Sequence, residues 1–156
     1  MKISLLSDMG LRRTSNQDFV GTFINQKGIS LVVLADGMGG HKAGNVASET
    51  AVLDLGNQWM STDMTELVDI RDWFIQVIEA ENHKIYQLGQ MEEYKGMGTT
   101  VEAVAIVNNN ILYAHVGDSR IGLVRGNQYQ LLTNDHSLVN ALVAAGELTE
   151  EEAESH

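Results

Sequence analysis

Acidic residues at the ends of predicted strands are the side chains of this chain best placed to do chemistry. Asp36 follows the apolar run 31–35, and three glycines lie within the next four positions, 37–40. The run predicts a strand buried on both faces, so Asp36 should stand at its mouth, where the chain turns. Glycine lets a backbone approach a ligand closely, and a carboxylate beside exposed carbonyl oxygens suits a hard divalent cation. We expect Asp36 and the carbonyl of Gly37 to bind metal, with a simple Asp-Gly turn as the alternative.

Other acids occur at similar boundaries between apolar and polar segments. They are Asp8, Asp18 and Asp118, the last of which follows the predicted strand 111–116. Acids at the mouths of two neighbouring strands converge, and a site for two hydrolytic metal ions needs bridging and flanking carboxylates. For Asp118, a turn acid that caps nearby amides is an equally open interpretation.

Basic side chains near these acids suggest an anionic substrate. Arg13 lies five residues before Asp18 in a polar segment, and a guanidinium can hold a phosphate through two parallel hydrogen bonds. A solvated surface arginine is the alternative, and spacing alone does not distinguish Arg13 from Arg12. His41, beside the glycines, and His136 could each move a proton near such a site.

The predicted elements follow one another as strands, two long helices and further strands. Strands are predicted at 2–7, 19–25, 29–35, 98–107, 111–116, 121–124 and 128–132, and helices at about 43–60, 66–89, 137–145 and from 149. Separate runs of strands and helices indicate an α+β fold, in which the long helices cover one face of a mainly antiparallel sheet. The segment 96–100, Gly-Met-Gly-Thr-Thr, is expected to be an entry turn, with a phosphate-binding loop as the alternative.

Composition excludes several classes of function. The 156 residues fit one domain, and the net charge of −11 argues against a nucleic-acid binder or a protein of anionic membrane surfaces. Cysteine is absent, which excludes disulfides, thiolate catalysis and zinc–thiolate sites. The sequence has no signal-peptide pattern and no apolar run that could span a bilayer, so we expect a cytoplasmic protein.

Five motifs in register give the chain a family resemblance. It resembles the metal-dependent protein serine/threonine phosphatases of the protein phosphatase 2C type, most closely the bacterial branch. The motifs are Ser7-Asp8-Met9-Gly10 with Arg13 and Asn16-Gln17-Asp18, Ala35-Asp36-Gly37-Met38-Gly39-Gly40, Gly96-Met97-Gly98-Thr99-Thr100, Val116-Gly117-Asp118-Ser119-Arg120, and Leu132-Thr133-Asn134-Asp135-His136-Ser137. The resemblance implies an α+β fold in which a β-sandwich of two antiparallel sheets is flanked by helices.

The resemblance also implies a role for each candidate residue. Asp36 is similar to the carboxylate that bridges two Mn²⁺ or Mg²⁺ ions, and the Gly37 carbonyl to a ligand of one of them. Asp18 resembles a ligand that acts through water, Asp118 a ligand of a third ion, and Arg13 the arginine that binds substrate phosphate. Such enzymes hydrolyse phosphoserine and phosphothreonine on proteins with a metal-activated water, without a covalent intermediate. The implied partners are phosphoproteins and a bacterial serine/threonine kinase that the enzyme opposes.

The chain departs from the family pattern in two places. Met38 stands where some members carry a histidine that is a candidate general acid. His41 lies nearby but does not occupy that position, so the role is not transferred to it, and His41 is named as a possible proton donor. The sequence also stops at His156, within a region that resembles the family's flap (about 136–156) and before two further metal-binding aspartates. We therefore expect residues 1–156 to be the N-terminal portion of a single phosphatase domain, weakly active or inactive by itself.

A non-catalytic binding module is the alternative function. In that interpretation the chain is a truncated or inactive phosphatase that binds partners through its surviving surface. An unpaired sheet edge could also join two copies as a homodimer. Binding of Mn²⁺ without turnover would favour the module over the enzyme.

Overall fold

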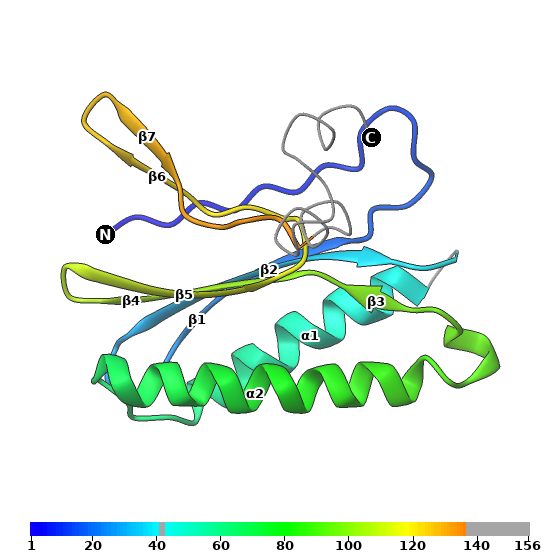
Figure 1. Cartoon of the computed structure of the whole chain (residues 1–156), viewed down its shortest axis with the longest axis horizontal. Helices are drawn as coiled ribbons and strands as arrows, with labels where there is room; N and C mark the ends of the chain where they lie inside the picture. The colour runs from blue at the N-terminus through cyan, green and yellow to red at the C-terminus, as the bar shows by residue number, and fades with distance from the viewer. Residues whose placement is uncertain (41–42, 137–156) are drawn as a thin grey trace, which may run out of the picture.

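A five-stranded antiparallel sheet forms the centre of the computed structural model, which describes residues 1–40 and 43–136 (Figure 1). Its strands are β1 (Asp18–Ile24), β2 (Ser30–Met38), β3 (Gly98–Thr99), β4 (Val101–Val107) and β5 (Asn110–Val116). Their order is β1-β2-β4-β5, and β3 pairs with the end of β2. A second, two-stranded sheet consists of β6 (Gly122–Arg125) and β7 (Gln128–Leu131).

Two long helices cover one face of the large sheet. They are α1 (Ala43–Met60) and α2 (Leu67–Leu88), followed by the short 3-10 turn η1 (Glu92–Tyr94). The β6–β7 hairpin lies on the other side of the sheet (Figure 1). The predicted α+β fold with antiparallel sheets and helices on one face of the main sheet is thus confirmed. In the described part of the chain, neither helix is both long and apolar enough to cross a bilayer.

The core lies between α1 and the sheet. The side chains at i, i+4, i+8 and i+12 that the sequence places on one face of this helix are all fully buried, namely Ala47, Ala51, Leu55 and Trp59. They meet the alternate residues of β2 that point toward the helices, which are Leu31, Val33 and Ala35, also fully buried. Burial of each large aliphatic side chain contributes about 1.5–3 kcal/mol. The Trp59 indole N–H also donates to the carbonyl of Ile29 at 3.1 Å, which fixes α1 to the start of β2.

Three details of the sequence-based assignment are wrong. Residues 2–7 form no strand, because no strand of the described residues pairs with them in a ladder. The segment 31–35 is fully buried only on its helix side, since Leu34 on the other face is 38% exposed. The strand predicted at 98–107 is interrupted at Thr100, where β3 ends and β4 begins. The helices predicted at 137–145 and from 149 lie outside the described residues.

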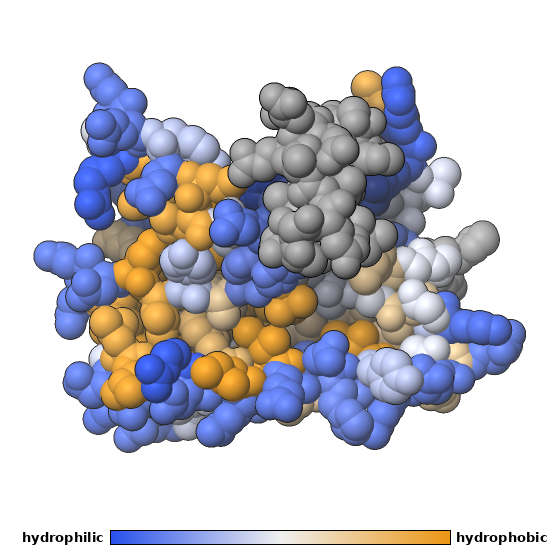
Figure 2. All heavy atoms as spheres, in the orientation of Figure 1, coloured by the Kyte–Doolittle hydropathy of each residue, from blue (hydrophilic) through white to orange (hydrophobic). Residues whose placement is uncertain are grey.

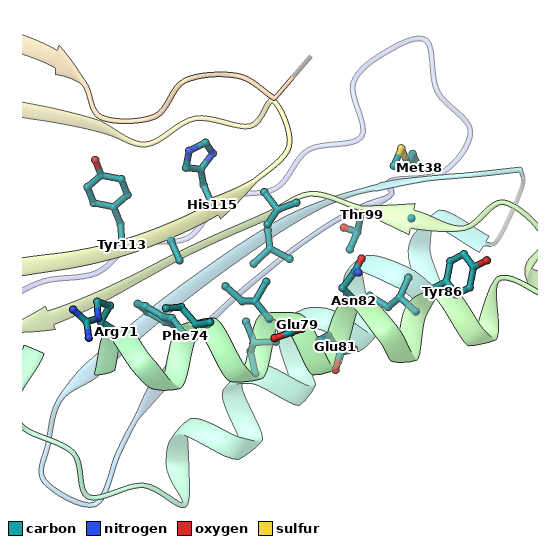
Figure 3. Close-up of a pocket in the computed structure, with 18 of the residues that line it drawn as sticks. Met38, Arg71, Phe74, Glu79, Glu81, Asn82, Tyr86, Thr99, Tyr113 and His115 are labelled. Carbon is teal, nitrogen blue, oxygen red and sulfur yellow. The ribbon is translucent and has the colours of Figure 1, made fainter. Parts of the chain in front are cut away.

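An apolar surface remains open beside the helices. Figure 2 shows hydrophobic side chains gathered between the β6–β7 hairpin and the helix below it. A cavity of about 790 Å³ lies there between α2 and β5, lined mainly by apolar side chains such as Phe74, Ile78 and Leu112 (Figure 3). Glu79 and Glu81 of α2 also contribute to its wall (Figure 3). This cavity contains none of the predicted metal or phosphate ligands.

Candidate metal and phosphate site

The register of β1 and β2 places two carboxyl groups side by side. Asp18 is the direct partner of Asp36 in the antiparallel ladder, so both side chains lie on the sheet face away from the helices. Burial raises the pKa of Asp36, and the charge of Asp18 and a hydrogen bond with its carboxyl raise it further. The guanidinium of Arg13 acts in the opposite direction. Two carboxyl groups held this close favour binding of a cation that neutralises both.

The backbone of Asp36 is held from both sides by two threonines. Its N–H donates to Thr100 Oγ1 at 2.9 Å, and its carbonyl accepts from the Thr100 N–H at 2.9 Å and from Thr99 Oγ1 at 3.0 Å. The segment 96–100, expected to be an entry turn, therefore fixes the position of the candidate metal ligand. The alternative of a phosphate-binding loop receives no support from these contacts.

Gly37 is required by the packing of its neighbours. A Cβ at this position would lie 2.0 Å from the Gly44 carbonyl oxygen and 2.8 Å from that of Gln17. The Gly37 N–H donates to the Gln17 carbonyl at 2.9 Å, and the Ser48 hydroxyl donates to the same oxygen at 2.6 Å. The start of α1 is thereby held directly against the end of β2.

A cleft of about 640 Å³ opens over these residues. Its walls bring together Asp36, Gly37, Asp118 and Arg13, as the sequence predicted, and Asp18 lies beside Asp36. The lining is Arg12, Arg13, Thr14, Ser15, Gln17, Asp36, Gly37, Met38, Gly39, Thr100 and Asp118. His41, the candidate proton donor, is outside the described residues.

The two arginines of the cleft carry no ion pair within residues 1–40 and 43–136. Arg71, Lys84 and Arg120 each pair with an aspartate, whereas Arg12 and Arg13 do not. Both guanidinium groups are therefore available to an anion that enters the cleft. The charge of Arg13 lowers the pKa of Asp36, which singles Arg13 out as the arginine that acts on the paired carboxyls.

The loop that carries Asp118 is held by the segment after β7. The His136 N–H donates to the Gly117 carbonyl at 2.8 Å, and Arg120 forms a two-point ion pair with Asp135 at 2.9 and 2.6 Å. This guanidinium lowers the pKa of the Asp135 carboxyl. The ring of His136 packs on that of His115 with centroids 4.4 Å apart. His136 is therefore part of the support for this loop and does not line the cleft.

Comparison with known proteins assigns the family. Residues 12–156 match the family described as protein phosphatase 2C. The chain belongs to the protein phosphatase 2C family. It is 64% identical to a protein phosphatase 2C-type protein of Streptococcus pyogenes serotype M6, over 100% of this chain and 63% of that protein. The chain thus spans less than two thirds of the length of this relative.

Solved structures of phosphatases have the same fold. The serine/threonine phosphatase of S. agalactiae superposes with a TM-score of 0.94 at 65% identity, covering 99% of this chain and 64% of that one. The catalytic domain of the serine/threonine protein phosphatase PstP, in complex with two manganese ions, superposes with a TM-score of 0.74 at 36% identity, covering 95% and 61%. The phosphatase 2C fold implied by the motifs is therefore confirmed.

Sequence reasoning missed several residues that support this candidate site. Thr99 and Thr100 were assigned to a turn, and Glu102 was overlooked inside a strand interpreted as apolar on both faces. Glu102 is only 4% exposed, and burial raises its pKa to about 7. The signals available were the adjacent threonines before a strand and a single acid within the apolar run 101–107.

The donor set fits a hard cation. Within the described residues, no group of three or more His, Cys, Asp and Glu side chains is arranged to hold a metal ion. Asp18 and Asp36 supply an adjacent oxygen pair, and Asp118 supplies another carboxylate in the same cleft. Mg²⁺ is bound through one or two carboxylates and keeps several waters, so an oxygen pair of this kind can serve it.

Proposed function

We propose that this chain carries the N-terminal part of the active site of a metal-dependent protein phosphatase that hydrolyses phosphoserine and phosphothreonine. The observation behind this proposal is the convergence of the Asp18–Asp36 pair, Asp118 and Arg13 on one cleft. Family membership favours the same function, as do the phosphatase names of its relatives. The relatives extend beyond the matched region, so the activity of the whole protein is part of the proposal.

Each residue has a defined task in this function. Asp36 and the Gly37 carbonyl would hold divalent cations, Asp18 would contribute through water, and Asp118 would hold a further ion. Mn²⁺ or Mg²⁺ bound there would lower the pKa of water and so supply the nucleophile near neutral pH. Arg13 would bind the phosphate oxygens and offset the negative charge that develops on them. No covalent intermediate with the chain is required.

The test is hydrolysis of p-nitrophenyl phosphate and of a phosphothreonine peptide by the 156-residue chain, with Mn²⁺ and with a chelator. We expect weak turnover that requires Mn²⁺ and disappears in Asp36→Asn. Turnover that persists with the chelator would contradict the proposal. Mn²⁺ binding without any turnover would instead favour the non-catalytic module for the isolated chain.

Several finer assignments remain predictions. A cognate serine/threonine kinase and its substrates are the expected partners, and the cytoplasm is the expected location. The preference for Mn²⁺ over Mg²⁺ is not decided by the donor atoms, because carboxylate and carbonyl oxygens suit both ions. Pairing of two copies through the outer edge of β1 or β5 is predicted to give a homodimer, which sedimentation analysis would detect.

A further inference from the structure

Glu102 is a buried acid directly behind the candidate metal site. It lies on β4, opposite Leu34 of β2 and His115 of β5, and this register puts its side chain on the same sheet face as Asp36. The residue is 4% exposed, and its Oε1 atom has no hydrogen-bond partner among the described residues. A carboxylate oxygen left without a partner in the interior is costly, so its presence calls for an explanation.

Hydroxyl groups connect Glu102 to both candidate metal ligands. Thr100 Oγ1 donates to Glu102 Oε2 at 3.3 Å and accepts the N–H of Asp36 at 2.9 Å. Thr100 Oγ1 also lies 2.9 Å from Ser119 Oγ, so the single proton of the Ser119 hydroxyl can go either to Thr100 or directly to Glu102. Ser119 directly follows Asp118. One buried side chain therefore contacts both the residue that fixes the Asp36 backbone and the loop that carries Asp118.

The electrostatics of this group are unfavourable without a cation. Burial is the main cause of the raised pKa of Glu102, the hydrogen bonds from Thr100 and Ser119 lower it, and the charges of Asp118 and Asp36 raise it. Three carboxyl groups thus repel one another around one end of the sheet. A divalent cation in the cleft would offset this repulsion, because each carboxylate would attract the cation.

We propose that Glu102 is a positioning residue of the cation site at Asp118: it holds the Asp118 loop against the Asp36 backbone through Ser119 and Thr100, and its buried charge strengthens cation binding. This inference rests on the proposed function, since it requires a cation in the cleft. It assigns Glu102 no contact with substrate. It also explains why an acid occupies a strand position whose neighbours Val101 and Ala103 are apolar.

The test compares the Mn²⁺ affinities of wild type, Glu102→Gln and Glu81→Gln at a pH well above 7. The relaxation rate of water protons reports how much Mn²⁺ is bound. Glutamine keeps the shape and an acceptor oxygen for Thr100, and it replaces the charged oxygen with a neutral NH2 group. Glu81 is the matched control, because it is also buried, at 5% exposure, has an unpartnered Oε1 and lies on α2 outside the cleft. We expect Glu102→Gln to weaken Mn²⁺ binding about 10-fold and Glu81→Gln to leave it unchanged.

Thermal unfolding without metal separates a metal-directed role from a merely structural one. In the absence of metal, we expect the melting temperature of Glu102→Gln to be at least as high as that of wild type, because a buried charge has been removed. Ser119→Ala, which keeps the charge and loses one contact, should weaken Mn²⁺ binding less than Glu102→Gln does.

Each result has a distinct meaning. Equal Mn²⁺ affinity of folded wild type and Glu102→Gln would overturn this inference and leave the proposed function intact. A parallel loss of stability and affinity would also overturn it, because it would show a general packing role. Absence of Mn²⁺ binding by wild type would contradict the proposed function itself and, with it, the role of Glu102.

Discussion

Asp18 and Asp36 face each other directly across the β1–β2 ladder, although 17 residues separate them in the sequence. The register of the β1–β2 ladder fixes this pairing. A shift of one residue would turn one of the two carboxyl groups to the opposite face of the sheet. The pair is unfavourable by itself, as the raised pKa of Asp36 indicates. The fold nevertheless holds the two carboxyl groups together, in a position where a bound cation would neutralise both.

Asp36→Asn should have opposite effects on stability and on metal binding. The metal-free chain should become slightly more stable, because the repulsion from Asp18 is removed. Loss of a residue that only orients a metal ligand lowers metal affinity roughly 10- to 100-fold. Because Asp36 is proposed to be a ligand itself, the Mn²⁺ affinity of Asp36→Asn should fall by more than that. Thermal melts with and without Mn²⁺ measure both effects. Asp8→Asn is the control, since Asp8 accepts the Gly10 N–H at 2.7 Å and is not part of the cleft lining. A similar loss of Mn²⁺ binding in that control would contradict the assignment.

Arg13→Ala should reduce phosphatase activity far more than Arg12→Ala. Both side chains line the cleft, and the charge of Arg13 is the one that lowers the pKa of Asp36. Loss of charged hydrogen bonds to phosphate costs about 1.5–3 kcal/mol, which corresponds to roughly 10- to 150-fold in kcat/KM. Arg12→Ala should change kcat/KM less than about 5-fold, as expected of a surface charge. Steady-state kinetics with p-nitrophenyl phosphate compare the two, and equal effects would argue against a special role for Arg13.

Gly37→Ala should destabilise the fold, whereas Gly40→Ala should not. The added Cβ at position 37 would lie 2.0 Å from the Gly44 carbonyl oxygen, so α1 would have to move away from β2. We expect a loss of about 3 kcal/mol in the free energy of unfolding, measured with urea. A Cβ at Gly40 would meet no atom within 4 Å. Comparable stability of the two variants would show that α1 does not pack on Gly37 as described.

The stability of the metal-free chain should fall as the pH rises from about 4.5 to about 7. Burial raises the pKa of both Glu81 and Glu102 from 4.5 to about 7, so the folded state binds their protons more tightly than the unfolded state does. This stabilisation is complete below the unfolded pKa and is lost as the pH rises through the folded one, by up to about 3 kcal/mol per group. Urea unfolding across this range measures it.

Glu81→Gln should remove the share of this pH dependence that belongs to Glu81. The control is Glu79→Gln, because Glu79 is exposed on the same helix. A slope that is unchanged in Glu81→Gln, or one that rises with pH in wild type, would show that Glu81 is not buried as a neutral acid.

Local patterns were sufficient to predict most of the fold. The apolar stripe from Ala47 to Trp59 predicted α1, which spans Ala43–Met60, and the continuous apolar run 31–35 located β2, which spans Ser30–Met38. The segment 2–7 has the composition of a strand, but a strand also requires a partner, and composition does not reveal whether one exists. The exposure of Leu34 has the same origin, since burial depends on what covers a sheet face.

The three acids Asp18, Asp36 and Asp118 could be singled out as candidate ligands because each stands where an apolar strand begins or has just ended. The residues that hold them were not, because their contacts join distant parts of the chain. Thr100 lies 64 residues from Asp36 in the sequence. Glu102 is connected to the loop of Asp118 through the Ser119 hydroxyl. Such hydrogen bonds depend on the strand register, which only the assembled sheet defines.

Paramagnetic broadening of amide NMR signals by Mn²⁺ would locate the ion without requiring turnover. We expect substoichiometric Mn²⁺ to broaden first the signals of residues 17–18, 36–37 and 117–119, and to leave those of β6, β7 and the middle of α2 sharp. Broadening centred on another acidic surface, or the same pattern in Asp36→Asn, would contradict a metal site built on the paired carboxyls.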